Sequence, residues 1–178
     1  MSTNERMALA AFRGLLEATS VQEAMAHVAA IASASAGADL TAVFLRVDGE
    51  PRLRLVAGDG CPAGLVGTLE LALGGAAPAA LALERRAPVL SSEDDARRAW
   101  PTDPLLEASA LTSWVAIPVV HAGEAIGALL VGRRDGPTLG GTEAALCGRI
   151  ADQAGVAVGR LRPAAEGNRR RPARGRAR

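Results

Sequence analysis

Residues 113–132, SWVAIPVVHAGEAIGALLVG, constrain the fold more than any other part of the chain. Two apolar segments, 114–120 and 125–131, are separated by the small or polar residues 121–124. β-Branched residues recur in both segments, and Gly123 can adopt the positive φ of a tight turn, so the pattern predicts a β-hairpin. Both arms are apolar on both faces, which is typical of strands at the centre of a covered antiparallel sheet.

Helices should supply part of that cover. Ser2 and Ser20 each stand three residues before a glutamate, the spacing of a capping box, so two helices are expected to begin there. Gly37 is a suitable C-cap for the second helix. Apolar residues at steps of three and four predict the buried stripes of these helices: Leu9, Phe12, Leu15 and Leu16 in the first, and Val21, Ala24, Val28 and Ile31 in the second.

The remaining elements are shorter, apart from one long helix near the C-terminus. Strands are expected over 41–47, 53–57, 68–73 and 89–90, with a turn at 48–51. Short helices are expected over 78–86, after Ser91 or Ser92 and after Asp103, followed by a long helix from Thr142 to Leu161 that Pro163 ends. Strands segregated from flanking helices predict an α+β fold with a central antiparallel sheet of about five to six strands.

Length and composition favour one domain. A chain of 178 residues with 49% hydrophobic residues can bury one core, which we assign to residues 1–162. Residues 163–178 are rich in arginine, glycine and proline, so we expect a disordered, solubilising tail without a specific nucleic-acid motif. The alanine and arginine bias suggests a bacterial source. The sequence shows no export signal or membrane segment, so a cytoplasmic location is expected.

Several segments together resemble the GAF domain, a small-molecule-sensing signalling module related in architecture to PAS domains. The strongest matches are 113–119, SWVAIPV, and 124–129, EAIGAL; weaker ones are 37–39 and 85–89. The resemblance runs from about Leu15 to Leu161. It implies terminal helices on one sheet face, and a roof over a ligand pocket formed by the 78–86 helix and residues 91–111. It also implies homodimers formed through the terminal helices.

Four better-known GAF activities each require residues that this chain lacks. Cyclic-nucleotide-binding members use an Asn-Lys pair, and the chain has no lysine. Bilin and haem sites need a cysteine or histidine near the roof, whereas residues 91–111 contain neither, and His27 and His121 lie elsewhere. Members that reduce free methionine sulfoxide use several cysteines, and here only Cys61 is expected near the pocket. The sequence therefore identifies no cofactor and no metal site.

Candidate ligand contacts come mainly from the expected roof. Arg97, Trp100 and Asp103 place an aromatic ring beside charges, as a small-molecule pocket requires; alternatively, Trp100 fills the core and the charges are solvated. Trp114 would belong either to the core or to the pocket floor. Cys61, in the loop sequence GDGCP, is either an unreactive thiol or, beside an arginine, a reactive one.

The expected function is regulatory. Gly155 and Gly159 lie one turn apart in the last helix, which suggests close approach of another helix from the same chain or from a second copy. We expect a non-catalytic signal-transduction sensor that binds a small molecule or a partner protein, forms a homodimer and acts on a separate output protein. The alternatives are a ligand-free dimerisation or scaffold domain, and a thiol-based redox enzyme that uses Cys61.

Overall fold

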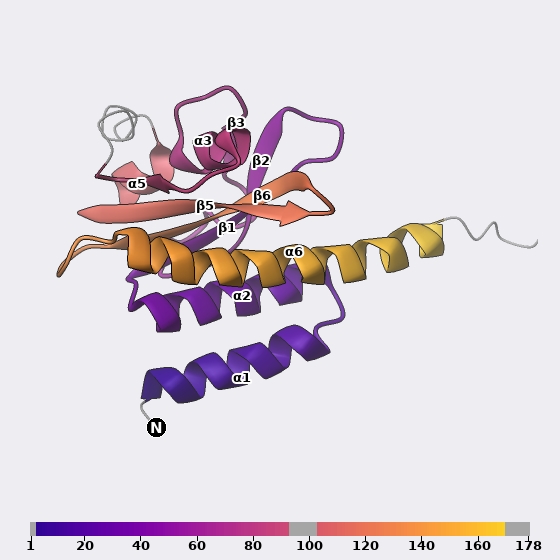
Figure 1. The fold of residues 1–178 in the computed structure, drawn as a ribbon. Helices are drawn as coiled ribbons and strands as arrows, with labels where there is room; N and C mark the ends of the chain where they lie inside the picture. The colour runs from indigo at the N-terminus through magenta and orange to yellow at the C-terminus, as the bar shows by residue number, and fades with distance from the viewer. Residues whose placement is uncertain (1–2, 93–102, 170–178) are drawn as a thin grey trace, which may run out of the picture.

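The computed structural model describes residues 3–92 and 103–169, and it confirms the α+β class (Figure 1). One antiparallel sheet has the strand order β3-β2-β1-β6-β5-β4. The strands are β1 (Leu40–Arg46), β2 (Arg52–Asp59), β3 (Glu70–Ala72), β4 (Val89–Leu90), β5 (Ser113–His121) and β6 (Glu124–Arg133). The helices are α1 (Thr3–Glu17), α2 (Val21–Ala36), α3 (Pro78–Arg85), α5 (Pro104–Ser109) and α6 (Gly141–Arg169).

The hairpin that dominates the sequence is confirmed: its second strand, β6, lies at the centre of the sheet, and β5 is the next strand outward. β5 and β6 pair from Ser113 opposite Arg133 to His121 opposite Glu124. Ala122 and Gly123 turn the chain with φ of 49° and 80°. β6 lies between β5 and β1, so both of its edges are paired over most of its length.

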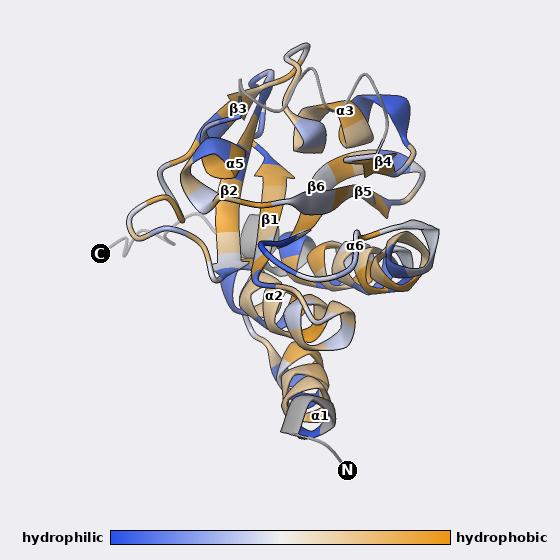
Figure 2. Cartoon of the chain, turned by 90° about the vertical axis from the view of Figure 1, so that its left-hand side faces the viewer, coloured by the Kyte–Doolittle hydropathy of each residue, from blue (hydrophilic) through white to orange (hydrophobic). Residues whose placement is uncertain are grey.

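Two apolar cores lie on the two faces of this sheet, as the alternation of side chains along β5 requires. In the helix-side core, residues such as Val115, Ile117 and Val119 pack against α2 and α6. The roof-side core includes Phe44, Leu53, Leu55, Leu105, Leu106, Trp114 and Leu130, under α3 and α5. Figure 2 shows the apolar strands between these two layers.

The predicted caps of α2 are confirmed. The Ser20 hydroxyl accepts a hydrogen bond from the backbone N–H of Glu23 at 3.1 Å, while the Glu23 carboxylate reaches the N–H of Thr19 at 2.9 Å. Gly37 ends the helix with φ of 58°. These bonds satisfy donors and acceptors that a helix terminus leaves unpaired.

The predicted buried stripe of α1 is wrong for three of its four residues. Leu15 is buried, but Leu9, Phe12 and Leu16 are 57%, 40% and 75% exposed. The reason is that α1 packs outside α2, away from the sheet (Figure 1), and a single neighbouring helix covers only a narrow face. Within that contact Gly14 accommodates the His27 ring, with which a Cβ at this position would collide.

Helix α6 also differs from the expectation at both ends. It begins at Gly141, before Thr142, and the Glu143 carboxylate accepts a hydrogen bond from the N–H of Gly140 at 3.0 Å. It continues through Pro163 to Arg169. A proline removes one helical hydrogen bond, but the alanines and glutamate that follow it favour helix.

Gly155 and Gly159 of α6 approach the sheet and not another helix. A Cβ at Gly155 would collide with the carbonyl oxygen of Val120, and one at Gly159 would collide with the ring of His121. The end of β5 therefore occupies the space that we expected a helix to fill. His121 is exposed, as predicted for a turn residue, but its ring lies against α6.

The third strand is shorter than predicted. Residues 68–73 alternate in hydrophobicity, yet β3 spans only Glu70–Ala72. The backbone N–H groups of Thr68 and Leu69 both donate to the carbonyl of Leu65, so a turn holds the first two residues of the expected strand. Across the described ranges, no helix is long and apolar enough to cross a lipid bilayer.

Candidate functional site

The roof-side core is the region where the sequence placed a ligand pocket. Trp114 is fully buried there, on the sheet face that α3 and α5 cover. Phe44, Leu53, Leu55, Leu105, Leu106 and Leu130 are buried in the same cluster. Trp114 and these side chains thus belong to one buried apolar cluster. Arg97 and Trp100, the other predicted roof contacts, lie outside the described residues.

Asp103 acts as the N-cap of α5. Its Oδ1 accepts hydrogen bonds from the backbone N–H groups of Leu105 at 2.8 Å and Leu106 at 3.2 Å. Burial raises the pKa of this carboxyl group, and the two backbone hydrogen bonds act in the opposite direction. The side chain is only 1% exposed. One of its two carboxylate oxygens, Oδ1, therefore serves the start of the helix.

Cys61 lies in the loop after β2 and is half-buried. Its Sγ donates to the carbonyl oxygen of Thr41 at 3.4 Å. Burial raises the pKa of the thiol to about 11, and the negative charge of Asp59 contributes in the same direction. Because the thiolate is the nucleophile, this environment makes the sulfur unreactive near neutral pH.

The second cysteine and the carboxylates form no metal centre in the part of the chain that the structure describes. Cys147 is buried in α6, where burial and then the charge of Glu143 raise its thiol pKa to about 11. Within residues 3–92 and 103–169, no group of three or more His, Cys, Asp or Glu side chains could hold a metal ion.

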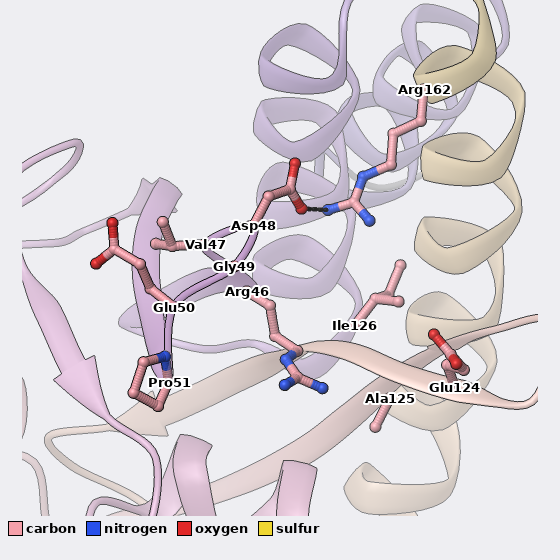
Figure 3. Close-up of a pocket in the computed structure, with 10 residues that line it drawn as sticks. All are labelled: Arg46, Val47, Asp48, Gly49, Glu50, Pro51, Glu124, Ala125, Ile126 and Arg162. Atoms are coloured by element: carbon pink, nitrogen blue, oxygen red, sulfur yellow. Dashed lines mark ion pairs between the residues drawn. The ribbon is translucent and has the colours of Figure 1, made fainter. Parts of the chain in front are cut away.

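A polar cleft opens at the end of the sheet where β1 and β6 separate (Figure 3). The β1–β6 pairing stops at Leu45 opposite Gly127. Beyond that point β1 turns toward β2, with the N–H of Val47 donating to the carbonyl of Arg52 at 3.0 Å, while the start of β6 pairs with β5. The cleft between them has a volume of about 440 Å³. We call it the β1–β6 cleft; it is lined by residues 46–51, Glu124, Ala125, Ile126 and Arg162.

Charged side chains from three segments face this cleft. Arg46 comes from the end of β1, Glu124 from the start of β6 and Arg162 from α6. Arg162 pairs with Asp48 at 3.9 Å, and Figure 3 shows these two side chains pointing toward each other. Arg46 and Glu124 have no hydrogen-bond or ion-pair partner among the side chains that the structure describes. Their polar atoms are therefore available to a ligand.

Sequence reasoning missed the β1–β6 cleft. Residues 46–51 were interpreted only as a strand end and a turn, and Glu124 only as part of the hairpin. The one local indication of this site in the sequence was Arg46, a charged residue at the end of an apolar strand. The cleft depends on the pairing of β1 with β6, which are separated by about 80 residues, and on the reach of α6 to Arg162. Local patterns do not reveal such non-local neighbours.

Comparisons with known proteins agree with this architecture. A family model described as a GAF domain matches residues 18–159. A GAF domain from a phosphoenolpyruvate-protein phosphotransferase of Coxiella burnetii is 20% identical with a TM-score of 0.77, and the match covers 93% of this chain and 99% of that one. No curated protein sequence matches.

Two further structural neighbours differ in their activities. Residues 122 to 287 of a methyl-accepting chemotaxis protein are 22% identical with a TM-score of 0.71, and the match covers 86% and 97% of the two chains. A free methionine-R-sulfoxide reductase of Neisseria meningitidis is 16% identical with a TM-score of 0.70, with coverages of 90% and 91%. At these identities the similarity shows the fold alone.

Proposed function

Because the chain belongs to the GAF domain family of small-molecule-binding signalling modules, we propose that it is a non-catalytic sensor. It binds a small molecule and transmits the signal to a separate output protein through its helical layer. The observation that carries this proposal is the apolar surface of that layer. Leu9, Phe12 and Leu16 of α1 are 57%, 40% and 75% exposed and recur at steps of three and four residues on one face of the helix, and such an exposed apolar stripe indicates an interaction surface.

The groove beside α1 supports the same assignment. It has a volume of about 340 Å³ and lies between α1, α2 and α6. Its lining includes Phe12 from α1, Ser35 from α2, and Leu146 and Ile150 from α6. An apolar side chain of another protein could enter it.

We further propose that a second copy of the chain uses this surface. Leu9, Phe12 and Leu16 follow one another at steps of three and four residues, so they form one stripe that can pack against the same stripe of another α1. A two-fold axis pairs identical patches, which suits such a stripe. The resulting homodimer would leave the β1–β6 cleft, at the end of the sheet, outside the contact.

The assignment as a non-catalytic protein rests on Cys61, which the sequence offered as the nucleophile of a redox enzyme, and on Asp103, which it offered as a ligand contact. The Cys61 thiol has a pKa of about 11, and the Asp103 carboxyl group is committed to capping α5. A nucleophile requires a lowered pKa or a neighbouring base. Neither group is placed in that way.

One specific observation favours a second candidate function, a ligand-free scaffold. The roof-side core contains large apolar side chains, including the fully buried Trp114 and Phe44. A scaffold would retain the helical contact surface and would bind no metabolite in either region.

A thermal-shift screen against broad metabolite pools separates the two candidates. A sensor at a ligand concentration 100 times the dissociation constant gains about 2.7 kcal/mol, which raises the melting temperature by roughly 5–10 °C for a chain of this size. A scaffold shows no shift with any pool.

Light scattering tests the helical surface separately. Leu16→Glu should reduce the dimer fraction, because it places a charge within the exposed stripe, whereas Ala10→Glu on another face of α1 should not. A parent protein that is monomeric at high concentration would contradict the dimer.

A further inference from the structure

The β1–β6 cleft combines charges of both signs that a small zwitterion could satisfy. We propose that this cleft binds a free amino acid or a similar aminocarboxylate, whose carboxylate is held by Arg46 and Arg162 and whose ammonium group faces Glu124. The inference rests on the proposed sensor function and deepens it, because it names the site and the chemical class of the signal.

Arg46 provides the main anchor for a carboxylate. Its side chain lies at the wall of the β1–β6 cleft (Figure 3) and has no hydrogen-bond or ion-pair partner within the described ranges. A guanidinium group offers a planar fork of donors that matches a carboxylate in a bidentate arrangement. Arg46 also lines an adjoining hollow, together with Leu83 and Arg86 at the C-terminal end of α3. Its side chain therefore lies between two cavities.

Arg162 can join Arg46 because its present ion pair is weak. The Arg162–Asp48 distance is 3.9 Å, and the two side chains are 39% and 94% exposed. Exposed pairs of this kind contribute little to stability. The carboxylate of a ligand can therefore replace Asp48 as the partner of Arg162 without a large loss of free energy.

The balance of charges favours a zwitterion over a multiply charged anion. Two arginines line the cleft together with three carboxylates, those of Asp48, Glu50 and Glu124. Glu50 also pairs with Arg52 at 3.6 Å. A phosphate dianion would approach these carboxylates and be repelled, and a simple carboxylate would leave Glu124 without a counter-charge. A ligand that carries both charges satisfies Arg46 and Glu124 together.

The size of the cleft agrees with this class of ligand. Its volume of about 440 Å³ lies in the lower part of the range for small-molecule sites, about 300–1,000 Å³. Arg162 belongs to α6, so a ligand bound there would connect the sheet end directly to the helical layer.

Solution NMR of the full chain tests the proposal with a panel of defined probes. The panel contains the twenty amino acids, their N-acetyl derivatives without an ammonium group, their amides without a carboxylate, and inorganic phosphate. At least one free amino acid should shift the backbone amides of residues 46–50 and 124–126. Its N-acetyl and amide derivatives should bind at least tenfold more weakly, because each loses one charge-assisted interaction.

Three variants assign the binding to the cleft. Arg46→Ala should weaken binding of the free amino acid about tenfold or more, and Glu124→Gln should weaken it without weakening the binding of the anionic N-acetyl derivative. Arg13→Ala on α1 removes an exposed arginine far from the cleft and should have no effect. A fold check by amide spectra accompanies each variant.

Several outcomes would overturn the proposal. These are the absence of binding by every free amino acid, equal effects of Arg46→Ala and Arg13→Ala, and tighter binding of phosphate than of any amino acid. Failure of the sensor function is distinguishable from these results. A metabolite that binds only beneath the roof would overturn the cleft assignment but not the sensor function. Amino-acid binding in the cleft that leaves the helical layer unchanged would support the cleft assignment and overturn the sensor function.

Discussion

The roof-side core and the β1–β6 cleft use polar groups in opposite ways. Near the roof, the Asp103 carboxyl group accepts two backbone hydrogen bonds and the Cys61 thiol donates to Thr41. In the cleft, Arg46 and Glu124 have no such partner among the described residues, and Arg162 holds a long, exposed ion pair. Polar groups that already hold hydrogen bonds within the fold are poor ligand contacts, which is why we propose a ligand at the end of the sheet.

The two regions should differ most in how much a substitution lowers the free energy of unfolding. Trp114→Ala should lower the free energy of unfolding by about 3–5 kcal/mol, because it leaves a cavity in the roof-side core. Arg46→Ala should change it by less than about 0.5 kcal/mol. Urea denaturation measures both, with Trp114→Phe as a milder variant if the alanine variant does not fold. Similar losses for the two alanine variants would remove the distinction between the regions.

The reactivity of Cys61 gives the next largest effect. With a thiol pKa of about 11, its thiolate fraction at pH 7 should be about 300-fold below that of an ordinary cysteine with a pKa of about 8.5. Alkylation of a Cys147→Ala variant should be slower than alkylation of the same chain in urea, although the higher intrinsic nucleophilicity of a high-pKa thiolate offsets part of this factor. The rate should rise about tenfold per pH unit between pH 7 and 9. A rate equal to that of the unfolded chain would restore the thiol-enzyme alternative.

Removal of the α5 cap should have a moderate effect. Asp103→Ala should destabilise the protein by about 1 kcal/mol, because two backbone N–H groups lose their acceptor. Urea midpoints measure this loss. An unchanged midpoint would show that the cap is dispensable and that the carboxyl group is free for another role.

The charge of Asp103 adds a pH dependence. Burial raises its pKa in the folded state, so the folded protein favours the neutral, protonated carboxyl group. The stability gained from this protonation is fully present below the unfolded pKa of about 3.9. That contribution is lost as the pH rises through the folded pKa. Relative to the parent, Asp103→Asn should therefore gain stability between pH 3.5 and pH 7. A change in the opposite direction would mean that the backbone hydrogen bonds outweigh burial.

The smallest expected effect concerns the cleft itself. Asp48→Asn removes the partner of Arg162 and should change the unfolding free energy by less than about 0.5 kcal/mol. It should raise the affinity for a free amino acid by about two- to fivefold, since the ligand no longer competes with Asp48. Calorimetry against the same amino acid measures this change. A loss of affinity would show that Asp48 contacts the ligand.

Much of the fold could be predicted because its signals are local. The 113–132 hairpin, the Ser20 cap and the Gly37 terminus follow from residues within a few positions of one another. The stripe on α1 misled because periodicity identifies an apolar face but not what covers it. Here α2 covers only the side that carries Leu15, and the face of Leu9 and Leu16 stays exposed.

The site was harder to predict than the fold. The predicted roof site rested on an aromatic ring and charges that are close in sequence; Trp114 is buried, Asp103 caps α5, and Arg97 and Trp100 lie outside the described residues. Arg46, Glu124 and Arg162 are far apart in sequence and meet only because β1 pairs with β6 while α6 extends past the end of the sheet. Such a cluster becomes visible only once the tertiary pairing is known.

A crystal structure of the full chain with the tightest-binding amino acid tests the central claim most directly. We predict density for the ligand between Arg46 and Glu124, with Arg162 turned from Asp48 toward its carboxylate and the packing around Trp114 unchanged. Ligand density beneath α3 and α5, with the roof-side core rearranged around it, would contradict the account.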